Sequence, residues 1–144
     1  MTTPGIDYVG VGVGAVVFDG TRRVFLAQRG PRARNETGTW EFPGGMVSFG
    51  ETLEEAIKRE FDEEYGMKIE LTGMLGAFDH ILLLETQHWI SITYCANHIG
   101  GDPEIREPEK CSAIGWFSLA DLPAELSEIS KKNVSALARF DQSP

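Results

Sequence analysis

Three glutamates of one predicted helix, Glu60, Glu63 and Glu64, have the residue type and spacing to bind a divalent cation. At roughly 100° per residue, Glu60 and Glu64 share a face with Ile57 and Phe61, and Glu63 lies just beside that face. Ionised carboxylates on a half-buried face repel one another and lose hydration, which is costly unless they are paired. Mg²⁺ relieves this conflict because it prefers oxygen ligands, and Mn²⁺ is an alternative ion. The pattern predicts a magnesium site, and the alternative is a charged helix whose acids are simply solvated.

The helix that carries these acids has clear start and stop signals. Thr52 and Glu55 have the form of a capping box, in which each side chain accepts a hydrogen bond from a free N–H of the first turn. Gly66 stands where a helix usually ends, because glycine tolerates the left-handed conformation. Arg59 can pair with Glu63 one turn later and hold it in place. Apolar residues recur at helical spacing between these ends: Leu53, Ala56, Ile57 and Phe61.

Residues 45–67 match the Nudix box, GX5EX7REUXEEXGU, in which U is an aliphatic residue. The fixed positions of the box are all filled: Gly45, Glu51, Arg59, Glu60, Glu63, Glu64 and Gly66. Phe61 and Met67 occupy the two U positions, and Phe61 departs from the usual aliphatic type, which affects packing more than chemistry. The chain therefore resembles the Nudix hydrolases. This resemblance implies an α+β fold, the Nudix α/β/α sandwich with a mixed β-sheet.

The composition is that of one acidic globular domain over residues 1–144. The net charge of −9, from 13 basic and 22 acidic side chains, disfavours a nucleic acid polymer as partner, because such a partner needs a basic surface. No apolar run approaches the roughly 20 residues of a membrane span, and the first residues lack a signal-peptide pattern. Cys95 and Cys111 lack metal-site spacing and are expected to be reduced packing residues. We therefore expect a cytoplasmic protein without a membrane partner.

Hydrophobic patterns outside the box predict the remaining elements. Strands are predicted over residues 9–18, 23–28, 40–42, 68–78, 88–97 and 114–117, a helical turn over 119–122 and a second helix over 125–140. Pro43-Gly44-Gly45 is expected to end the third strand. Two helices on a mixed sheet agree with the sandwich that the resemblance implies.

Three glycines, Gly10, Gly12 and Gly14, alternate within the first predicted strand. A dinucleotide-binding loop needs its glycines at a strand-to-helix turn, so that interpretation is rejected. Glycines on one face of a strand allow a close neighbour, which is either a ligand or another part of the protein.

The loops beside the box supply further candidates. By resemblance, the carbonyl of Gly44 is a metal ligand and Glu51 orients the loop or the metal shell. Arg29, at a strand end, is a candidate phosphate clamp because its planar fork can bind two oxygens. Arg32 and Arg34 lie on the same stretch and are expected to be solvated.

A second charged segment, residues 106–111, precedes the strand predicted at 114–117. Spacing alone indicates a charged loop. Together with residues 11–14 and 49–52, however, this segment resembles the plant cytosolic Nudix hydrolases and the vertebrate MutT-homologue type that act on nucleoside triphosphates. That resemblance implies that Glu109 binds an additional metal or positions water.

The same subgroup resemblance suggests where a nucleobase would bind. Trp116 is a candidate for the base pocket because aromatic faces stack on bases, and a plain core position is an equal alternative. Phe42, Trp89 and Ser91 are weaker candidates for the pocket.

The resemblance implies hydrolysis of a nucleoside diphosphate linked to a group X. For a nucleoside triphosphate, including an oxidised one, the products are the monophosphate and pyrophosphate. Arg59 belongs to the implied catalytic group, and Glu63, Glu64 and Glu109 are alternative general bases. ADP-ribose and prenyl diphosphates are alternative substrates, and a non-catalytic, nucleotide-sensing module is an alternative from another class. The subgroup also implies a homodimer.

Overall fold

The computed structural model describes residues 1–141, so the last three residues of the predicted 1–144 domain lie outside the described chain. The elements are β1 (Gly10–Phe18), β2 (Val24–Arg29), β3 (Trp40–Glu41), β4 (Gly44–Met46), α1 (Leu53–Tyr65), β5 (Lys68–Leu82), β6 (Gln87–Gly100), β7 (Cys111–Phe117) and α2 (Glu128–Asp141). Within residues 1–141, neither helix combines the length and the apolar character that crossing a membrane requires.

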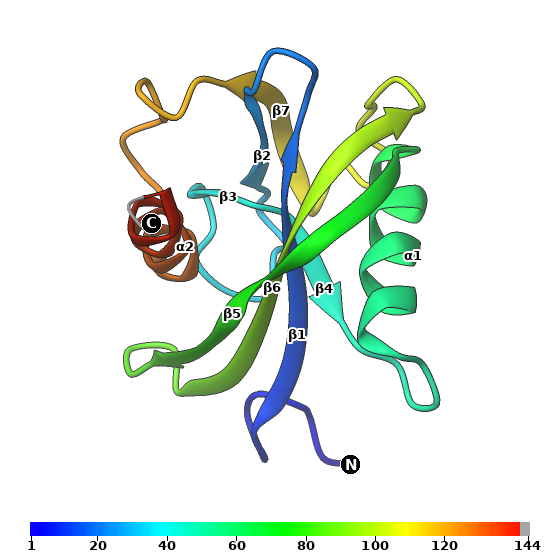
Figure 1. Cartoon of the computed structure of the whole chain (residues 1–144). Helices are drawn as coiled ribbons and strands as arrows, with labels where there is room; N and C mark the ends of the chain where they lie inside the picture. Colours follow the sequence, from blue (N-terminus) through cyan, green and yellow to red (C-terminus); the bar gives the residue numbers. More distant parts are fainter. Residues whose placement is uncertain (142–144) are drawn as a thin grey trace.

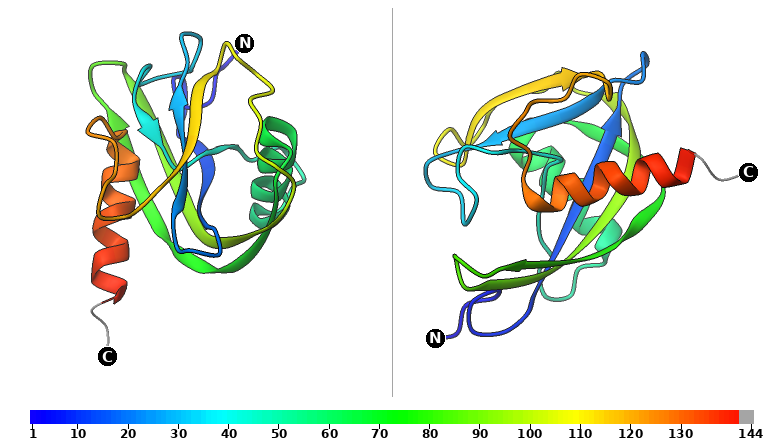
Figure 2. Two further views of the ribbon diagram at one scale, coloured as in Figure 1. Left: turned by 90° about the horizontal axis from the view of Figure 1, so that it is seen from above. Right: turned by 90° about the vertical axis from the view of Figure 1, so that its left-hand side faces the viewer.

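The strands form one mixed sheet with a helix on each side (Figures 1 and 2). The strand order is β3-β2-β1-β6-β5, with β4 paired to β1 and β7 paired to β2. β1 and β6 run parallel, whereas the other described pairs are antiparallel. The α+β fold with a mixed sheet that the sequence predicts is confirmed.

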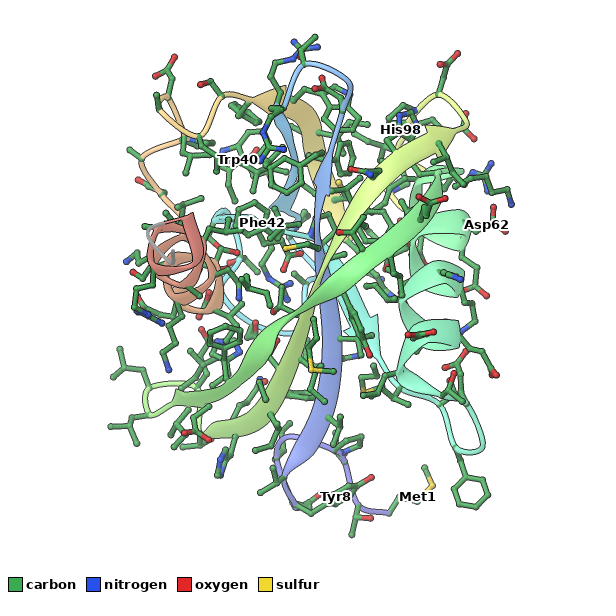
Figure 3. All side chains as sticks on the ribbon, viewed as in Figure 1. Met1, Tyr8, Trp40, Phe42, Asp62 and His98 are labelled. Atoms are coloured by element: carbon green, nitrogen blue, oxygen red, sulfur yellow. The ribbon has the colours of Figure 1, made fainter. Side chains whose placement is uncertain are left out.

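Each face of the sheet has its own hydrophobic core. Because side chains alternate across a strand, Phe25 packs with Phe61 and Tyr65 beneath α1, whereas Leu26 packs with Phe42 on the other face. In Figure 3, Phe42 lies between the sheet and α2, and Asp62 points from α1 away from the sheet. Burial on both faces fixes the position of α1 and α2 relative to the strands.

Helix α1 begins and ends where the sequence signals indicate. The Thr52 hydroxyl accepts a 3.1 Å hydrogen bond from the Glu55 N–H, and the Glu55 side chain completes the capping box. Gly66 adopts the left-handed conformation at φ 67° and ends the helix. Ile57 and Phe61 are fully buried, which confirms the apolar face from which the glutamates were located.

Helix α2 begins at Glu128, three residues later than its pattern predicts. The preceding backbone is already engaged with β3, because the Trp40 N–H donates to the Glu125 carbonyl and the Ser127 N–H donates to the Trp40 carbonyl. Residues 119–121 form a turn rather than the predicted helical turn. The local apolar pattern is thus overridden by pairing with a distant strand.

Strand β4 is absent from the sequence-based prediction, which treats Gly44 and Gly45 only as a stop. In the structure these glycines pair with Gly14 and Val13 of β1. A Cβ on Gly44 would lie 1.8 Å from the Val13 carbonyl oxygen, so only glycine permits this approach. On β1, Gly12 and Gly14 pair across to β4. One close neighbour of those glycines is therefore another part of the protein.

We expect Gly44→Ala to lower the free energy of unfolding by about 3 kcal/mol, because the new methyl overlaps the β1 backbone. Gly20→Ala is the matched control, because a Cβ there meets nothing within 4 Å, and it should change stability by less than about 0.5 kcal/mol. Urea denaturation of both variants measures the difference. Equal stability of the two variants would contradict the close pairing of β4 with β1.

Candidate active site

Two adjoining cavities lie where α1, β3 and β4 meet. The outer chamber, about 500 Å³, is lined among others by Arg59, Glu60, Glu64, Glu107, Lys110 and Cys111. The inner chamber, about 130 Å³, is lined among others by Glu36, Phe42, His80, Trp89, Ser91 and Asn133. Both are lined by Arg29, Arg34, Glu41, Gly44 and Gly45. The two chambers are therefore adjacent.

Glu60 and Glu64 face each other at the wall of the outer chamber. Burial, then the charge of Glu60 and a hydrogen bond shared with it, raise the pKa of Glu64 to about 9. Burial also raises the pKa of Glu60, against the opposing effect of Arg59. A Cβ on Gly45 would lie 2.3 Å from the Glu60 carboxyl carbon, so glycine at this position leaves room for the carboxyl group. The two acids share the apolar face of α1, as the helical spacing predicts.

Arg59 joins helix α1 to the loop that precedes it. Its Nε and Nη2 donate to Glu51 at 2.5 and 2.9 Å, and Nη2 also donates to the Met46 carbonyl at 3.1 Å. The hydrogen bond from Arg59, with one from the Ser48 N–H, lowers the pKa of Glu51 to about 2. This geometry agrees with the loop-orienting role that the resemblance gives Glu51.

Glu63 does not join the other two acids, which corrects the expectation of three converging carboxylates. Its side chain is 61% exposed and pairs with Arg59 Nη1 at 3.3 Å, as the spacing predicts. A step of three residues turns roughly 60° short of a full circle, so Glu63 leaves the buried face on the side of Arg59. Across residues 1–141, no three His, Cys, Asp or Glu side chains converge as a preformed cation site.

The residues present nevertheless fit a magnesium ion. Glu60 and Glu64 supply carboxylate oxygens, which are the ligands that Mg²⁺ prefers. Two ionised carboxylates at this spacing repel each other, and a shared proton partly relieves that repulsion. The backbone of Gly44 and Gly45 lines the same wall, and carbonyl oxygens are also suitable ligands. A divalent cation in place of the shared proton would remove the repulsion between the two carboxylates.

The structure gives Arg29 a different environment from that expected of a phosphate clamp. Its Nη1 donates to both oxygens of Glu41 at 2.8 and 2.9 Å, and its Nε donates to the Asn35 carbonyl at 2.7 Å. Burial raises the pKa of Glu41, and the charge of Arg29 opposes that rise. Because Glu41 neutralises Arg29, the charge available to a phosphate is reduced.

Arg34 is exposed, as the sequence analysis expects, and it also lines both chambers. Its guanidinium carbon lies 5.1 Å from the centre of the Trp89 ring. Burial and the charge of Arg29 lower its pKa, whereas Glu60 and Glu64 raise it. Its charge therefore acts on the same space as the two acids.

The loop of residues 106–111 contributes a glutamate other than the one predicted. Glu107 lines the outer chamber and its charge helps to raise the pKa of Glu64. Glu109 is exposed and is not among the residues that line either chamber. A turn at residues 108–110 begins after Glu107 and contains Glu109, so the two side chains have different directions. Hydrogen bonds from the Lys110 and Cys111 N–H groups to the Glu107 carbonyl close this turn.

Trp116 packs in the core beneath α1, away from both chambers. Its ring lies 5.3 Å from that of Phe25 and 5.5 Å from that of His98. The core position, one of the two alternatives for this residue, is the one found. Strand β7 pairs with β2 rather than with β6, which carries Trp116 away from the inner chamber.

The weaker pocket candidates, Phe42, Trp89 and Ser91, all line the inner chamber. Trp89 donates from its ring N–H to Gln87 at 2.8 Å, which fixes the ring at the chamber wall. Sequence reasoning missed Glu41, which stands beside Phe42 in a short strand without any motif. A charged residue in an otherwise aromatic strand end, Trp-Glu-Phe, was the available signal.

A second buried acid, Glu36, holds the loop between β2 and β3. Its carboxylate contacts His80 Nε2 at 3.2 Å and accepts a 3.1 Å hydrogen bond from the Glu128 N–H at the start of α2. Burial tends to raise the pKa of Glu36, but these two hydrogen bonds bring it below its ordinary value. Local patterns in the sequence do not predict this contact, because its partners are far apart in the chain.

A family model and a solved structure both match this chain over most of its length. A family model described as NUDIX domain matches residues 9–138. A MutT NUDIX hydrolase structure from Burkholderia pseudomallei superposes with a TM-score of 0.82 and 34% identity, covering 89% of this chain and 97% of that one.

Two curated relatives are named for different substrates. An ADP-ribose pyrophosphatase of Methanocaldococcus jannaschii is 35% identical over 60% of this chain and 50% of its own length. An 8-oxo-dGTP diphosphatase of Proteus vulgaris is 40% identical over 45% of this chain and 57% of its own length. The chain thus spans about half the length of each of these relatives.

The raised pKa of Glu64 predicts a pH-dependent stability in the absence of divalent metal. Its ordinary value is 4.5 and its value in the fold is about 9, so stability present below pH 4.5 is lost as the pH rises towards 9. We expect Glu64→Gln to be more stable than wild type at pH 8 in EDTA, by about 1–3 kcal/mol, and equally stable near pH 4.

Thermal unfolding in EDTA across this pH range measures the effect. Glu70→Gln, at an exposed position on β5, is the matched control and should follow wild type. Added Mg²⁺ should raise the melting temperature of wild type more than that of Glu64→Gln. A pH-independent difference between Glu64→Gln and wild type would contradict the buried carboxyl pair.

Proposed function

This chain belongs to the Nudix hydrolase superfamily, and from that premise we propose that it hydrolyses nucleoside triphosphates, including oxidised ones, to monophosphate and pyrophosphate. The observation that carries the proposal is the Glu60–Glu64 pair at the wall of a chamber that adjoins a second, polar chamber. The outer chamber is suited to a cation and a polyphosphate, and the inner chamber to the rest of a nucleotide.

Glu60 and Glu64, with the Gly44 carbonyl, are the proposed ligands of Mg²⁺ or Mn²⁺, and Glu63 is adjacent to them. When bound, the ion would offset phosphate charge and lower the pKa of a water molecule. Arg59 holds the loop before α1 against Glu51, and so keeps the ligand-bearing wall in place.

Positive charge for the phosphates would come from the opposite wall of the outer chamber. Arg34 and Lys110 both line it, and either can donate hydrogen bonds to phosphate oxygens. Arg29 contributes less, because Glu41 neutralises it. These contacts would place the polyphosphate across the two acids, with the nucleoside directed towards the inner chamber.

For the general base, the geometry favours a residue that the sequence did not select. Glu64 is committed to the cation, Glu63 is directed to solvent, and Glu109 is outside the chamber lining. Glu107 faces the same space as Glu64. We therefore propose that Glu107 accepts the proton of the attacking water, as a base within reach of the reacting group must.

The polar character of the inner chamber supports a nucleotide over a prenyl diphosphate. Ser91, Thr93, His80 and Asn133 line it. Asn133 donates to Thr93, and His80 contacts Glu36, but a prenyl tail would displace water from their remaining donors and acceptors and offer no hydrogen bond in return. The names of the Proteus vulgaris and Methanocaldococcus jannaschii relatives suggest 8-oxo-dGTP and ADP-ribose as substrates to compare. A cytoplasmic homodimer remains part of the proposal.

We expect Glu64→Gln to lower Mg²⁺-dependent turnover by roughly 100-fold or more, because it removes a charged ligand and leaves the fold intact. Product formation measures it: pyrophosphate from nucleoside triphosphates, AMP and ribose phosphate from ADP-ribose, and phosphate from prenyl diphosphates. Glu70→Gln is the control of normal rate. Near-normal rates of Glu64→Gln on every substrate would refute the assignment of Glu64 as a metal ligand. Nucleotide binding by wild type without turnover would support the sensing module instead.

Replacing each glutamate of the loop at residues 106–111 by glutamine tests which of the two is the general base. Glu107→Gln should lower kcat by roughly 10- to 100-fold, whereas Glu109→Gln should change it by less than about threefold, since its side chain is exposed. Both are measured at saturating Mg²⁺ and substrate. A larger loss in Glu109→Gln than in Glu107→Gln would return the role to the residue that the sequence suggested.

A further inference from the structure

We propose that Glu41 determines the nucleobase specificity, by accepting hydrogen bonds from the N–H groups of a guanine-type base edge in the inner chamber. Glu41 can do so only if the protein acts on nucleotides, so the inference rests on the proposed function. Neither the box nor its resemblance assigns a role to this residue, which lies on β3 outside the motif.

The size of the inner chamber suits a ring rather than a phosphate chain. The inner chamber, at about 130 Å³, is close to the roughly 150 Å³ that holds one benzene ring, so it can take the six-membered ring of a purine and the edge of that ring. The rest of the purine would lie towards the adjoining outer chamber, which shares five lining residues with the inner one. Phe42 and Trp89 supply aromatic carbon to its walls. A planar base that enters from the outer chamber would find both flat apolar surface and polar groups.

The charges around the inner chamber nearly cancel, which disfavours an anionic occupant. Two arginines and two glutamates line it: Arg29, Arg34, Glu36 and Glu41. Arg29 donates two hydrogen bonds from one nitrogen to Glu41, and Glu36 contacts His80 and accepts a hydrogen bond from the first N–H of α2. A phosphate would therefore find no excess of positive charge at this end, so the neutral base is the part of the nucleotide that fits here.

Glu36 and Glu41 both line this chamber, and Glu41 is the more exposed of the two. Each oxygen of an ionised carboxylate has two lone pairs, and Arg29 uses one on each oxygen of Glu41. The side chain is 19% exposed, so the remaining lone pairs can be reached from the cavity. Arg29 is itself fixed by the Asn35 carbonyl, and it therefore holds the carboxylate in one orientation.

A carboxylate held in this way distinguishes purines by their donor groups. Guanine presents two adjacent donors, the N1–H and the 2-amino group, which match the two oxygens of a carboxylate. Adenine presents one donor beside an acceptor, and an acceptor facing a carboxylate is repelled. A bidentate contact of this kind contributes roughly ten- to hundredfold discrimination between bases. Oxidation at C8 leaves this edge unchanged, so guanine and 8-oxoguanine nucleotides are both accepted by it.

The test compares kcat/KM for GTP, ITP and ATP, which share a triphosphate and ribose and differ at the base edge. ITP lacks the 2-amino donor. Wild type should prefer GTP over ATP by roughly ten- to hundredfold, with ITP between them. In Glu41→Gln the GTP preference should fall to less than about threefold, because the amide presents a donor in place of one acceptor. Glu70→Gln should keep the wild-type order.

The wild-type comparison of GTP with ITP needs no variant, so the inference can be tested even if Glu41→Gln does not fold; a circular dichroism melt reports folding. Equal rates for all three nucleotides in wild type, or an unchanged preference in folded Glu41→Gln, would overturn the role of Glu41 while leaving triphosphate hydrolysis intact. dGTP is measured alongside in wild type and Glu41→Gln, and a change in the GTP-to-dGTP ratio alone would assign Glu41 to the ribose and also overturn its role at the base. Absence of hydrolysis of every triphosphate would instead refute the proposed function.

Discussion

The structure depends on the burial of two carboxylates, Glu60 and Glu64, on the face that α1 presents to the sheet. Ile57 and Phe61 hold that face against the core, so the acids cannot turn to water without removing the helix from its packing. Their repulsion and lost hydration favour a proton or a cation between them. With such a pair on the apolar face of α1, the metal-free protein is less stable than the protein with a bound cation. This difference in stability favours metal binding at the site.

The same constraint explains the glycines that precede α1. The pair needs a wall of backbone close to it, and β4 supplies that wall because Gly44 lies directly against β1 and Gly45 leaves room for the Glu60 carboxyl group. Arg59 then fixes the loop between β4 and α1 through Glu51 and the Met46 carbonyl. Strand, loop and helix are thus joined around one cavity, and disturbing any one of them would move the oxygens that face it.

The parts of the site that the sequence predicted are those whose interacting residues lie close together in the chain. Helix α1, its caps and the shared face of Glu60 and Glu64 depend on residues a few positions apart, and the pattern predicted them correctly. Whether Arg29 meets a phosphate or Glu41 depends on how β2 pairs with β3, and the position of Trp116 depends on β7 pairing with β2. Those pairings are not encoded in local periodicity, so Glu41, Glu36 and Glu107 could not be found from it.

The two chambers are coupled by the electric field of their acids. Glu64 is influenced by Glu60 on its own helix, by Glu41 on β3 and by Glu107 on the loop between β6 and β7, and all three raise its pKa. The Arg29 charge beside Glu41 therefore limits the repulsion at the outer chamber as well as fixing the carboxylate in the inner one. A cation at Glu60 and Glu64 would relieve the repulsion from three elements at once, whereas a base bound at Glu41 would reduce only one part of it. Metal affinity should accordingly depend on the whole acidic field, and base selection on Glu41 alone.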